Sequence, residues 1–176
     1  MVDIASFKFD PTITPILFVS LVALLVSIIS LLISIRYWSK SFRPIVTAMV
    51  KTHAAGNLGT IFDLEILNTG SIPAKNIQLK AEQNNIKNAL GMDSSPDNKR
   101  RWLSCFDSEN KITILHNNSS IKCSFGQSKA NDQGFWKYKA IIPIKIEYEG
   151  WFGKKYVQDQ DIQIIDSESF TGYQWG

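Results

Sequence analysis

The sequence has little of the residues that build metal centres, disulfide frameworks or catalytic sites. Its 176 residues include only two cysteines and two histidines, too few for a disulfide-dense secreted scaffold. It contains no glycine-rich phosphate loop, no nucleophile elbow and no paired-carboxylate motif. The length suits one domain of ordinary size and excludes a large enzyme with two domains around a cleft. We therefore expect no enzymatic activity, no metal and no cofactor.

The few candidate metal ligands stand apart in the sequence. His53 and His116 have no Cys, Asp or Glu at ligand spacing beside them, which favours surface histidines over a zinc site or a catalytic dyad. Asp159 and Asp161 share one face of an expected strand. Such a pair is more typical of a solvated face than of a calcium site.

Charge is absent from one long stretch near the start. Pro15–Ile35 comprises 21 consecutive residues without a charge and without Asn, Gln, His or Gly. At about 1.5 Å rise per residue it forms a helix of about 32 Å, which matches the roughly 30 Å hydrocarbon core of a bilayer. A cleavable signal peptide is the alternative, but the stretch is too long and lacks a basic leader and a small-residue exit. The pattern predicts one uncleaved transmembrane helix over residues 13–38, after a short extracytoplasmic segment, 1–12.

The charges that flank this helix differ between its two ends. Three charged residues of mixed sign precede it, whereas four cations follow it before the first acidic residue: Arg36, Lys40, Arg43 and Lys51. Cations near a helix end resist translocation, so we expect a single-pass protein of the inner (plasma) membrane with its N-terminus outside and its C-terminal domain in the cytoplasm. Cations and aromatic rings are typical of headgroup depth. The expected interface residues are Arg36, Tyr37, Trp38, Lys40 and Arg43.

The formal net charge of +3 arises around the membrane helix. From Thr52 to Gly176, 14 Lys and Arg balance 14 Asp and Glu. The basic residues therefore indicate contact with anionic lipid, worth about 1 kcal/mol per cation. They give no support for a nucleic-acid-binding face, and we expect no DNA partner.

Small residues recur within the apolar stretch at alternating intervals of three and four. They are Ser20, Ala23, Ser27, Ser30 and Ser34. This is the a/d spacing of a left-handed helix pair, and small residues let helices approach closely in lipid. We expect a packing seam for a homo-oligomer; the helix of a protein partner is a second interpretation. A third is that the serines bond back to their own helix.

After a basic link over residues 39–44, the apolar pattern changes to a period of two. Ile142–Tyr148 shows it most clearly, and Phe62–Leu67 and Ile77–Ala81 repeat it. Further strand candidates are Ile45–Val50, Ile112–Leu115, Ile121–Phe125 and Tyr156–Ile165. Seven short strands without another convincing helix predict an all-β, antiparallel sandwich over residues 45–166. In the weakest region, 83–106, Asn84–Leu90 is either a short helix or part of a long connection between sheets.

Two passages resemble bacterial immunoglobulin-like domains. Leu64–Ile77 contains a strand, an Asn-x-Gly turn, Pro-Ala and a second strand, as many of these domains do. Ile146–Tyr156 is similar to their closing hairpin, with a Tyr on each strand and Gly at the tip. The whole arrangement is similar to a loose class of small bacterial single-pass membrane proteins, some of which are associated with anti-phage defence. The resemblance implies an immunoglobulin-like sandwich of about seven strands and says almost nothing about activity.

Both cysteines are expected inside this sandwich. Cys123 alternates inward with Ile121 and Phe125, and Cys105 lies in an apolar run, 102–106. Buried thiols behave as small hydrophobic groups, and the cytoplasm keeps them reduced. We expect two free thiols. A bridge between them is the alternative, and it would place the domain in an oxidising compartment.

One group of cations follows a polar turn. Trp102 follows three cations, Lys99, Arg100 and Arg101. Cations bind phosphate oxygens and an indole stacks on a nucleotide base, so the group has the chemistry of a nucleotide site. These four residues form a candidate site for an anionic ligand such as a cyclic nucleotide. The alternative is a solvated loop whose Trp102 packs into the core.

The last ten residues, 167–176, form an aromatic tail that we expect to dock on the domain or on a neighbouring chain. The sequence as a whole predicts a membrane-anchored, self-associating cytoplasmic binding or scaffold module of a bacterial membrane assembly. Two alternatives stay open. One is a ligand-gated membrane effector of an anti-phage system that senses a small anionic signal, and the other is an accessory subunit of a larger membrane complex.

Overall fold

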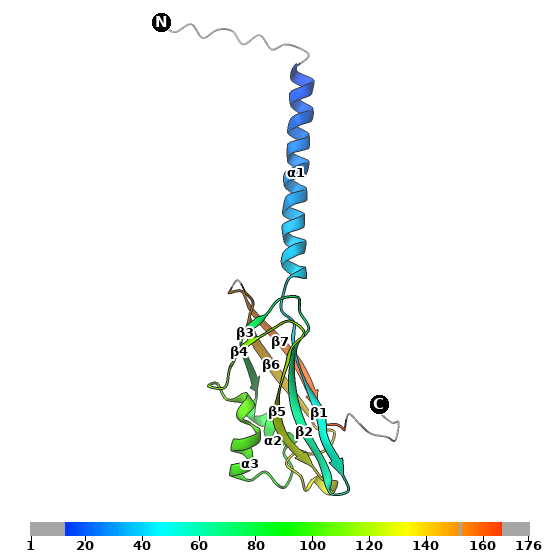
Figure 1. Ribbon diagram of the computed structural model, residues 1–176, viewed down its shortest axis with the longest axis vertical. Helices are drawn as coiled ribbons and strands as arrows, with labels where there is room; N and C mark the ends of the chain where they lie inside the picture. The colour runs from blue at the N-terminus through cyan, green and yellow to red at the C-terminus, as the bar shows by residue number, and fades with distance from the viewer. Residues whose placement is uncertain (1–12, 152, 167–176) are drawn as a thin grey trace. The chain divides into compact units, whose positions relative to one another are not determined.

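The computed structural model describes residues 13–151 and 153–166, which fall into two units that meet between Phe42 and Arg43 (Figure 1). The first unit is one helix, α1 (Ile13–Ser41), three residues longer than expected. The second is a domain of β-strands. The expected extracytoplasmic segment, 1–12, and the aromatic tail, 167–176, lie outside the described residues.

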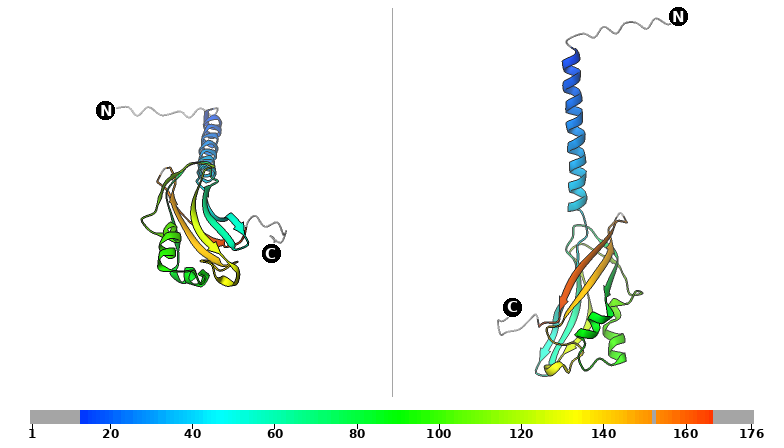
Figure 2. Two further views of the ribbon diagram at one scale, coloured as in Figure 1. Left: turned by 60° about the horizontal axis from the view of Figure 1, so that its bottom comes forward. Right: turned by 180° about the vertical axis from the view of Figure 1, so that it is seen from behind.

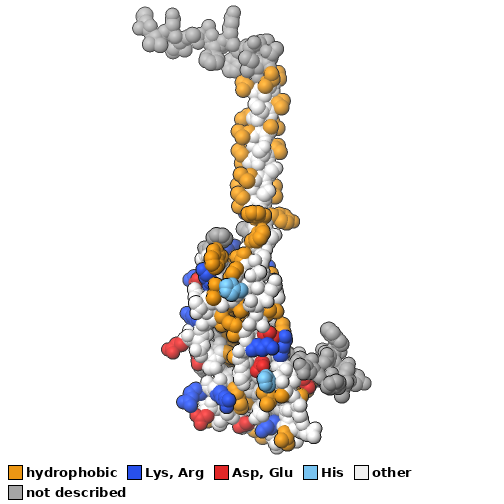
Figure 3. All heavy atoms as spheres, viewed as in Figure 1, with side chains coloured by type: hydrophobic (Ala, Val, Ile, Leu, Met, Phe, Trp, Pro, Cys, Tyr) orange, Lys and Arg blue, Asp and Glu red, His pale blue; other side chains and the backbone are white. Residues whose placement is uncertain are grey.

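The apolar part of α1 is long enough to cross a membrane. Pro15–Trp38 spans 24 residues with a mean hydropathy of 3.1, and none of its most apolar stretch is buried. Figure 3 shows hydrophobic side chains along the visible face of α1, whereas charged side chains gather on the β domain. Pro15 lies in the first turn, where no helical hydrogen bond needs its missing N–H. A helix pairs every backbone group internally, which suits a segment surrounded by hydrocarbon.

Each of the seven expected strands is present. They are β1 (Val46–Gly56), β2 (Gly59–Asn68), β3 (Ala74–Ala81), β4 (Ile112–Leu115), β5 (Ser120–Ser128), β6 (Ile141–Glu149) and β7 (Lys155–Gln163). All neighbouring strands are antiparallel and form two sheets, in the orders β1-β2-β5 and β4-β3-β6-β7. Figure 2 shows the two sheets as separate curved layers. The described chain is therefore mostly β, with one long apolar helix at its start.

The connection between β3 and β4 is more helical than expected, since a short helix was one of two interpretations for Asn84–Leu90 and none was expected at α3. This connection contains α2 (Gln83–Ala89), α3 (Pro96–Trp102) and a 3-10 turn, η1 (Ser104–Phe106). Ser95 caps α3 by accepting a hydrogen bond from the Asn98 backbone N–H, and Pro96 fills the first helical position. Serine followed by proline starts a helix here, although the same residues are also typical of a turn. A second 3-10 turn, η2 (Ala130–Asp132), follows β5.

Alternating side chains of both sheets build the core. Ile142, Ile144 and Ile146 of β6 are at most 3% exposed, as the period-two pattern requires. Three buried aromatic rings pack together in the core. The Trp136 ring lies 4.9 Å from Phe125 and 4.7 Å from Phe135, and the Trp136 indole N–H donates to the Phe125 carbonyl. Large aromatic side chains contribute strongly to core stability because they bury so much area.

The two open sides of the sandwich are closed differently. At the β1 and β7 side, the Gln160 side-chain amide bonds to the backbone of Ala48, accepting from its N–H and donating to its carbonyl. This amide replaces the ladder that the two edge strands do not form with each other. At the β4 and β5 side, α3 and η1 cover the gap instead.

The Asn68 side chain joins the start of the sandwich to the turn after β2 and to the end of β4. It is fully buried. Its amide donates to the carbonyls of Ile72 and Leu115 at 2.9 and 3.1 Å, and its Oδ1 accepts from the N–H groups of Ile45 and Gly70 at 3.2 and 3.0 Å. Both donors and the acceptor are therefore satisfied, as a buried amide requires.

Replacing this amide with a carboxylate tests its role. Asn68→Asp keeps the shape but cannot donate to Ile72 and Leu115 while ionised, so we expect the free energy of unfolding to fall by about 2–4 kcal/mol. Urea unfolding of the full chain in detergent, followed by tryptophan fluorescence, measures the loss. Asn117→Asp in a neighbouring exposed turn is the control, with an expected change within about 0.5 kcal/mol. Equal effects for the two variants would contradict this role.

Glu65 is a buried acid on the outer face of β2. Its side chain is covered by Lys51, whose Nζ lies 2.5 Å from Oε2, and by Ser120 and Lys122 on β5. Hydrogen bonds from Lys51 and Ser120 lower the pKa of this carboxyl, although burial opposes them. A lowered pKa in the folded state means that ionised Glu65 stabilises the fold at neutral pH and that this contribution is lost as the pH falls through the folded-state pKa.

The variant Glu65→Gln tests this pH dependence. Because Lys51 is half exposed, we expect the free energy of unfolding to fall by only about 0.5–1 kcal/mol at pH 7. The difference from the unmodified chain should shrink as the pH falls below about 4, where the carboxyl of the unmodified chain gains its proton. Urea unfolding at several pH values measures it, with Glu109→Gln at an exposed position as the control. A constant difference across this range would show that Glu65 acts through packing and not through its charge.

Candidate functional site

The small residues of α1 all lie on its exposed surface. These are Ser20, Ala23, Ser27, Ser30 and Ser34. The Ser20 hydroxyl donates to the Leu17 carbonyl at 2.9 Å and the Ser27 hydroxyl donates to the Ala23 carbonyl at 2.8 Å. For these two serines, bonding back to their own helix is therefore present. This stripe of small residues offers close approach to another helix, and its Ser20 and Ser27 hydroxyl groups need no partner outside α1.

The expected interface residues lie at the end of α1 and just beyond it. Tyr37 and Trp38 are 74% and 71% exposed, and the Trp38 ring packs edge to face on Phe42 at 5.3 Å. Lys40 lies in the last turn, where a cation interacts favourably with the helix dipole. Arg36 is in α1, and Arg43 is the first residue of the β domain. Exposed aromatic rings beside cations are the chemistry of a membrane interface.

The predicted anion site is split by the fold. Lys99, Arg100 and Arg101 are exposed in the last turn of α3, and Arg100 is 3.6 Å from Asp97. Trp102 is half-buried, with its ring packed edge to face on Phe135 at 4.8 Å. The indole thus packs against the core as the alternative interpretation states, but the segment is the helix α3 and not a solvated loop. Binding of a cyclic nucleotide by the three cations stays a prediction.

A cavity of about 390 Å³ opens at the β4 and β5 side of the sandwich. Its apolar wall comes from both sheets, and its rim carries polar groups of the segment around η1. The lining includes Ile66, Ile77, Leu79, Ile112, Cys105 and Cys123. Small-molecule sites are concave and mostly apolar with a few polar groups, so this cavity is the candidate binding pocket of the domain.

Both cysteines line this cavity and are unbridged. Cys123 and Ile121 lie on the inner face of β5 as predicted, beside the buried Leu64 and Ile66, but the two cysteines are only half-buried and Ile121 is 40% exposed. The reason is that β5 is an edge strand, and an open cavity separates its first residues from β3 of the second sheet. A hydrogen bond between the two thiols lowers the pKa of Cys123, while that bond and burial raise the pKa of Cys105.

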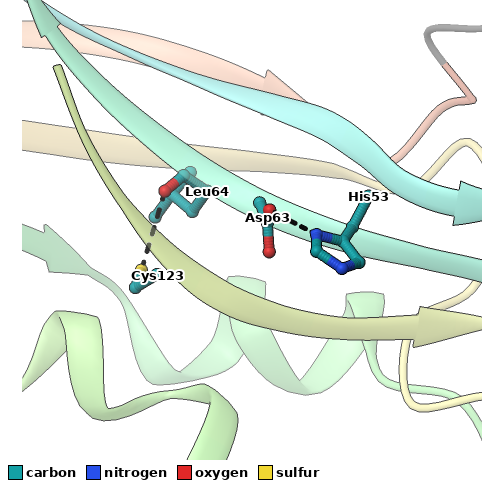
Figure 4. Close-up of polar contacts among 4 residues, drawn as sticks. All are labelled: His53, Asp63, Leu64 and Cys123. Atoms are coloured by element: carbon teal, nitrogen blue, oxygen red, sulfur yellow. Dashed lines mark hydrogen bonds and ion pairs between the residues drawn. The ribbon is translucent and has the colours of Figure 1, made fainter.

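His53 has an acidic partner that the sequence does not reveal. Its Nδ1 lies 2.9 Å from Oδ2 of Asp63 on the neighbouring strand (Figure 4). The β1 and β2 register shifts between Thr52 and Ala54, so His53 is the extra residue of a bulge. An irregularity of this kind leaves no clear sign in a period-two pattern, and only the strand register shows which acid faces the histidine.

The His53 and Asp63 pair cannot activate Cys123. Asp63 and Leu64 are consecutive residues of β2, so their side chains point to opposite faces of the sheet. Leu64 is buried and pairs with Cys123, whose thiol donates to the Leu64 carbonyl at 3.7 Å (Figure 4). The histidine and the thiol therefore lie on opposite sides of one sheet, and no cysteine and histidine dyad forms between them.

Among the described residues, no three His, Cys, Asp or Glu side chains gather where they would hold a metal ion. Asp159 and Asp161 are exposed on β7, and Asp159 lies 3.8 Å from the Lys145 ammonium of β6. The geometry of this pair is that of an ordinary solvated strand face.

The fold and these sites together define a chain of two parts, an apolar helix long enough to span a membrane and a β domain with a pocket at one side. This chain belongs to the family described as a domain of unknown function (DUF8453), whose model matches residues 6–170. The match covers α1 as well as the β domain. No curated protein matches the chain in sequence.

Proposed function

We propose that this chain is a membrane-anchored binding or scaffold module of a bacterial membrane assembly. Its helix crosses the inner membrane once, its immunoglobulin-like sandwich lies in the cytoplasm, and its copies associate through the stripe of small residues. The observation that carries the proposal is the exposure of α1. Its large apolar side chains are 43–68% exposed from Ile16 to Ile35, and each would cost about 1.5–3 kcal/mol if left in water.

The sheet orders support an immunoglobulin-like sandwich. In a constant-type immunoglobulin domain, the first, second and fifth strands lie in one sheet and the third, sixth and seventh in the other. The order here follows this division, with β1-β2-β5 in one sheet and β3-β6-β7 in the other. The fourth strand, β4, pairs with β3 instead of extending the first sheet. This is a change at one edge, and it leaves the central strand arrangement as the resemblance implies.

The family match supports an anchor over a cleaved leader. It begins at residue 6 and continues through α1 into the sandwich, so the helix and the domain occur as one unit. The connection between them is short: α1 ends at Ser41, and Pro44 is already buried in the β domain. A leader is removed from its protein, whereas a helix joined so closely to a domain is suited to holding it at the membrane.

The orientation is testable with a thiol reagent that does not cross membranes. Two cysteines, Ser6→Cys before α1 and Ser108→Cys at an exposed position of the β domain, are introduced into a chain in which Cys105 and Cys123 are replaced by serine. In intact cells we expect labelling of the N-terminal position alone, since the cations after α1 stay in the cytoplasm. Both positions should be labelled after lysis, which is the control. Labelling of Ser108→Cys in intact cells would reverse the proposed orientation.

The stripe is testable by filling it. Ser27→Leu and Ser30→Leu together place large side chains on the stripe without adding charge, so the helices can no longer approach closely. We expect the dissociation constant of the oligomer to rise by about tenfold or more, equivalent to about 1.4 kcal/mol. Fluorescence energy transfer between labelled full chains in lipid vesicles measures this change. Ile28→Leu and Ile29→Leu, off the stripe, form the matched control. A chain that is monomeric before mutation contradicts self-association, and cross-links from the stripe to a different membrane protein would indicate an accessory subunit.

A further inference from the structure

The two thiols meet although they come from different parts of the chain. Cys105 lies in η1 and Cys123 in β5, and both side chains lie in the wall of one cavity, close enough to shift each other's pKa. The aromatic residues beside them hold the same segments together, because the Phe106 ring packs edge to face on the Phe125 ring at 6.1 Å. The Asn110 side chain also fixes η1 by donating to the Ser104 carbonyl at 2.8 Å.

The two thiols are not equivalent. The hydrogen bond from Cys105 lowers the pKa of Cys123, so Cys123 is the thiol that forms a thiolate first. The same bond and burial raise the pKa of Cys105, which keeps its proton. A thiolate is the nucleophile in thiol oxidation, and a sensitive cysteine is commonly accompanied by a second thiol that resolves its oxidised form. The position of both sulfurs in the wall of an open cavity gives a small oxidant access to them.

We propose that Cys105 and Cys123 form a reversible dithiol and disulfide centre whose oxidant is hydrogen peroxide. The Cys123 thiolate attacks one peroxide oxygen, the O–O bond breaks, and the released hydroxide takes up a proton to become water. Cys123 is then a sulfenic acid. The Cys105 sulfur attacks the Cys123 sulfur, the S–O bond breaks, and the hydroxide leaves as water with the Cys105 proton. Two thiols and one peroxide thus give one disulfide and two waters.

The bridge would add a covalent link between two regions that packing and a hydrogen bond from Gln127 to Asp93 already connect. Cys105 belongs to the helical connection that covers the β4 and β5 side, and Cys123 belongs to the sheet β1-β2-β5. A covalent bond between them fixes this cover to the sheet at the cavity. The oxidation state of the pair therefore controls how freely the connection moves over the pocket.

The test uses the full chain in detergent, reduced, freed of reductant and treated with an equimolar amount of hydrogen peroxide. Alkylation and mass spectrometry should show an unalkylated chain that has lost two hydrogen atoms, with a peptide linking Cys105 to Cys123, and dithiothreitol should restore both thiols. In Cys105→Ser, Cys123 should gain one oxygen and react with dimedone. In Cys123→Ser, the remaining thiol should be oxidised more slowly by on the order of tenfold.

The experiment on the unmodified chain shows, without any variant, whether Cys105 and Cys123 form a disulfide within one chain. Two thiols that both remain open to alkylation, or bridges that join separate chains, would overturn the centre. Equal oxidation rates for the two single variants would overturn the roles given to the two sulfurs. The test uses the purified chain and reads out neither membrane orientation nor self-association, so a failure of the centre is separate from a failure of the proposed function.

Discussion

The β domain depends on one buried side chain, the amide of Asn68. It is the point at which the first residues of the domain, the turn after β2 and the end of β4 meet. A buried amide without hydrogen-bond partners lowers the free energy of unfolding by more than a typical single contact adds to it. The stable fold therefore requires all of these segments to be in place. Gly70 adds a steric requirement, because a Cβ at this position would lie 2.6 Å from the Pro44 Cα. The chain that leaves α1 is thus fixed by hydrogen bonds and by the lack of space around Gly70.

The strands of this domain are predictable from the sequence, because apolar and polar residues alternate along a strand that has one buried and one exposed face. β6 shows this best, with every second residue from Ile142 to Tyr148 buried. α3 was harder to predict, since Ser95 and Pro96 are equally suited to a turn and to the start of a helix. No pattern of seven residues is long enough to separate the two. The helix α1 needs no such distinction, because its length and lack of charge are enough to predict a helix that could span a membrane.

The candidate sites were less predictable than the strands because they depend on register and on long connections. The His53 and Asp63 pair arises from one extra residue in β1, which changes the facing residue without changing the composition. The thiol pair arises because η1 packs against β5, eighteen positions further along the chain. Neither contact follows from the residues next to the cysteines. By contrast, packing of Trp102 against the core was one of two interpretations open at the outset, and the Phe135 contact shows where the indole lies.

The shortness of the connection between α1 and the sandwich has a geometric consequence. Only Phe42 and Arg43 separate the helix from buried Pro44, a tether of about 7 Å at full extension. With α1 in a bilayer, the domain is confined to a thin layer beside the lipid, whatever its angle. Encounters between copies then take place by lateral diffusion in two dimensions, at an effective concentration set by surface density instead of by cell volume. A modest affinity between helices or domains is sufficient for assembly under such confinement.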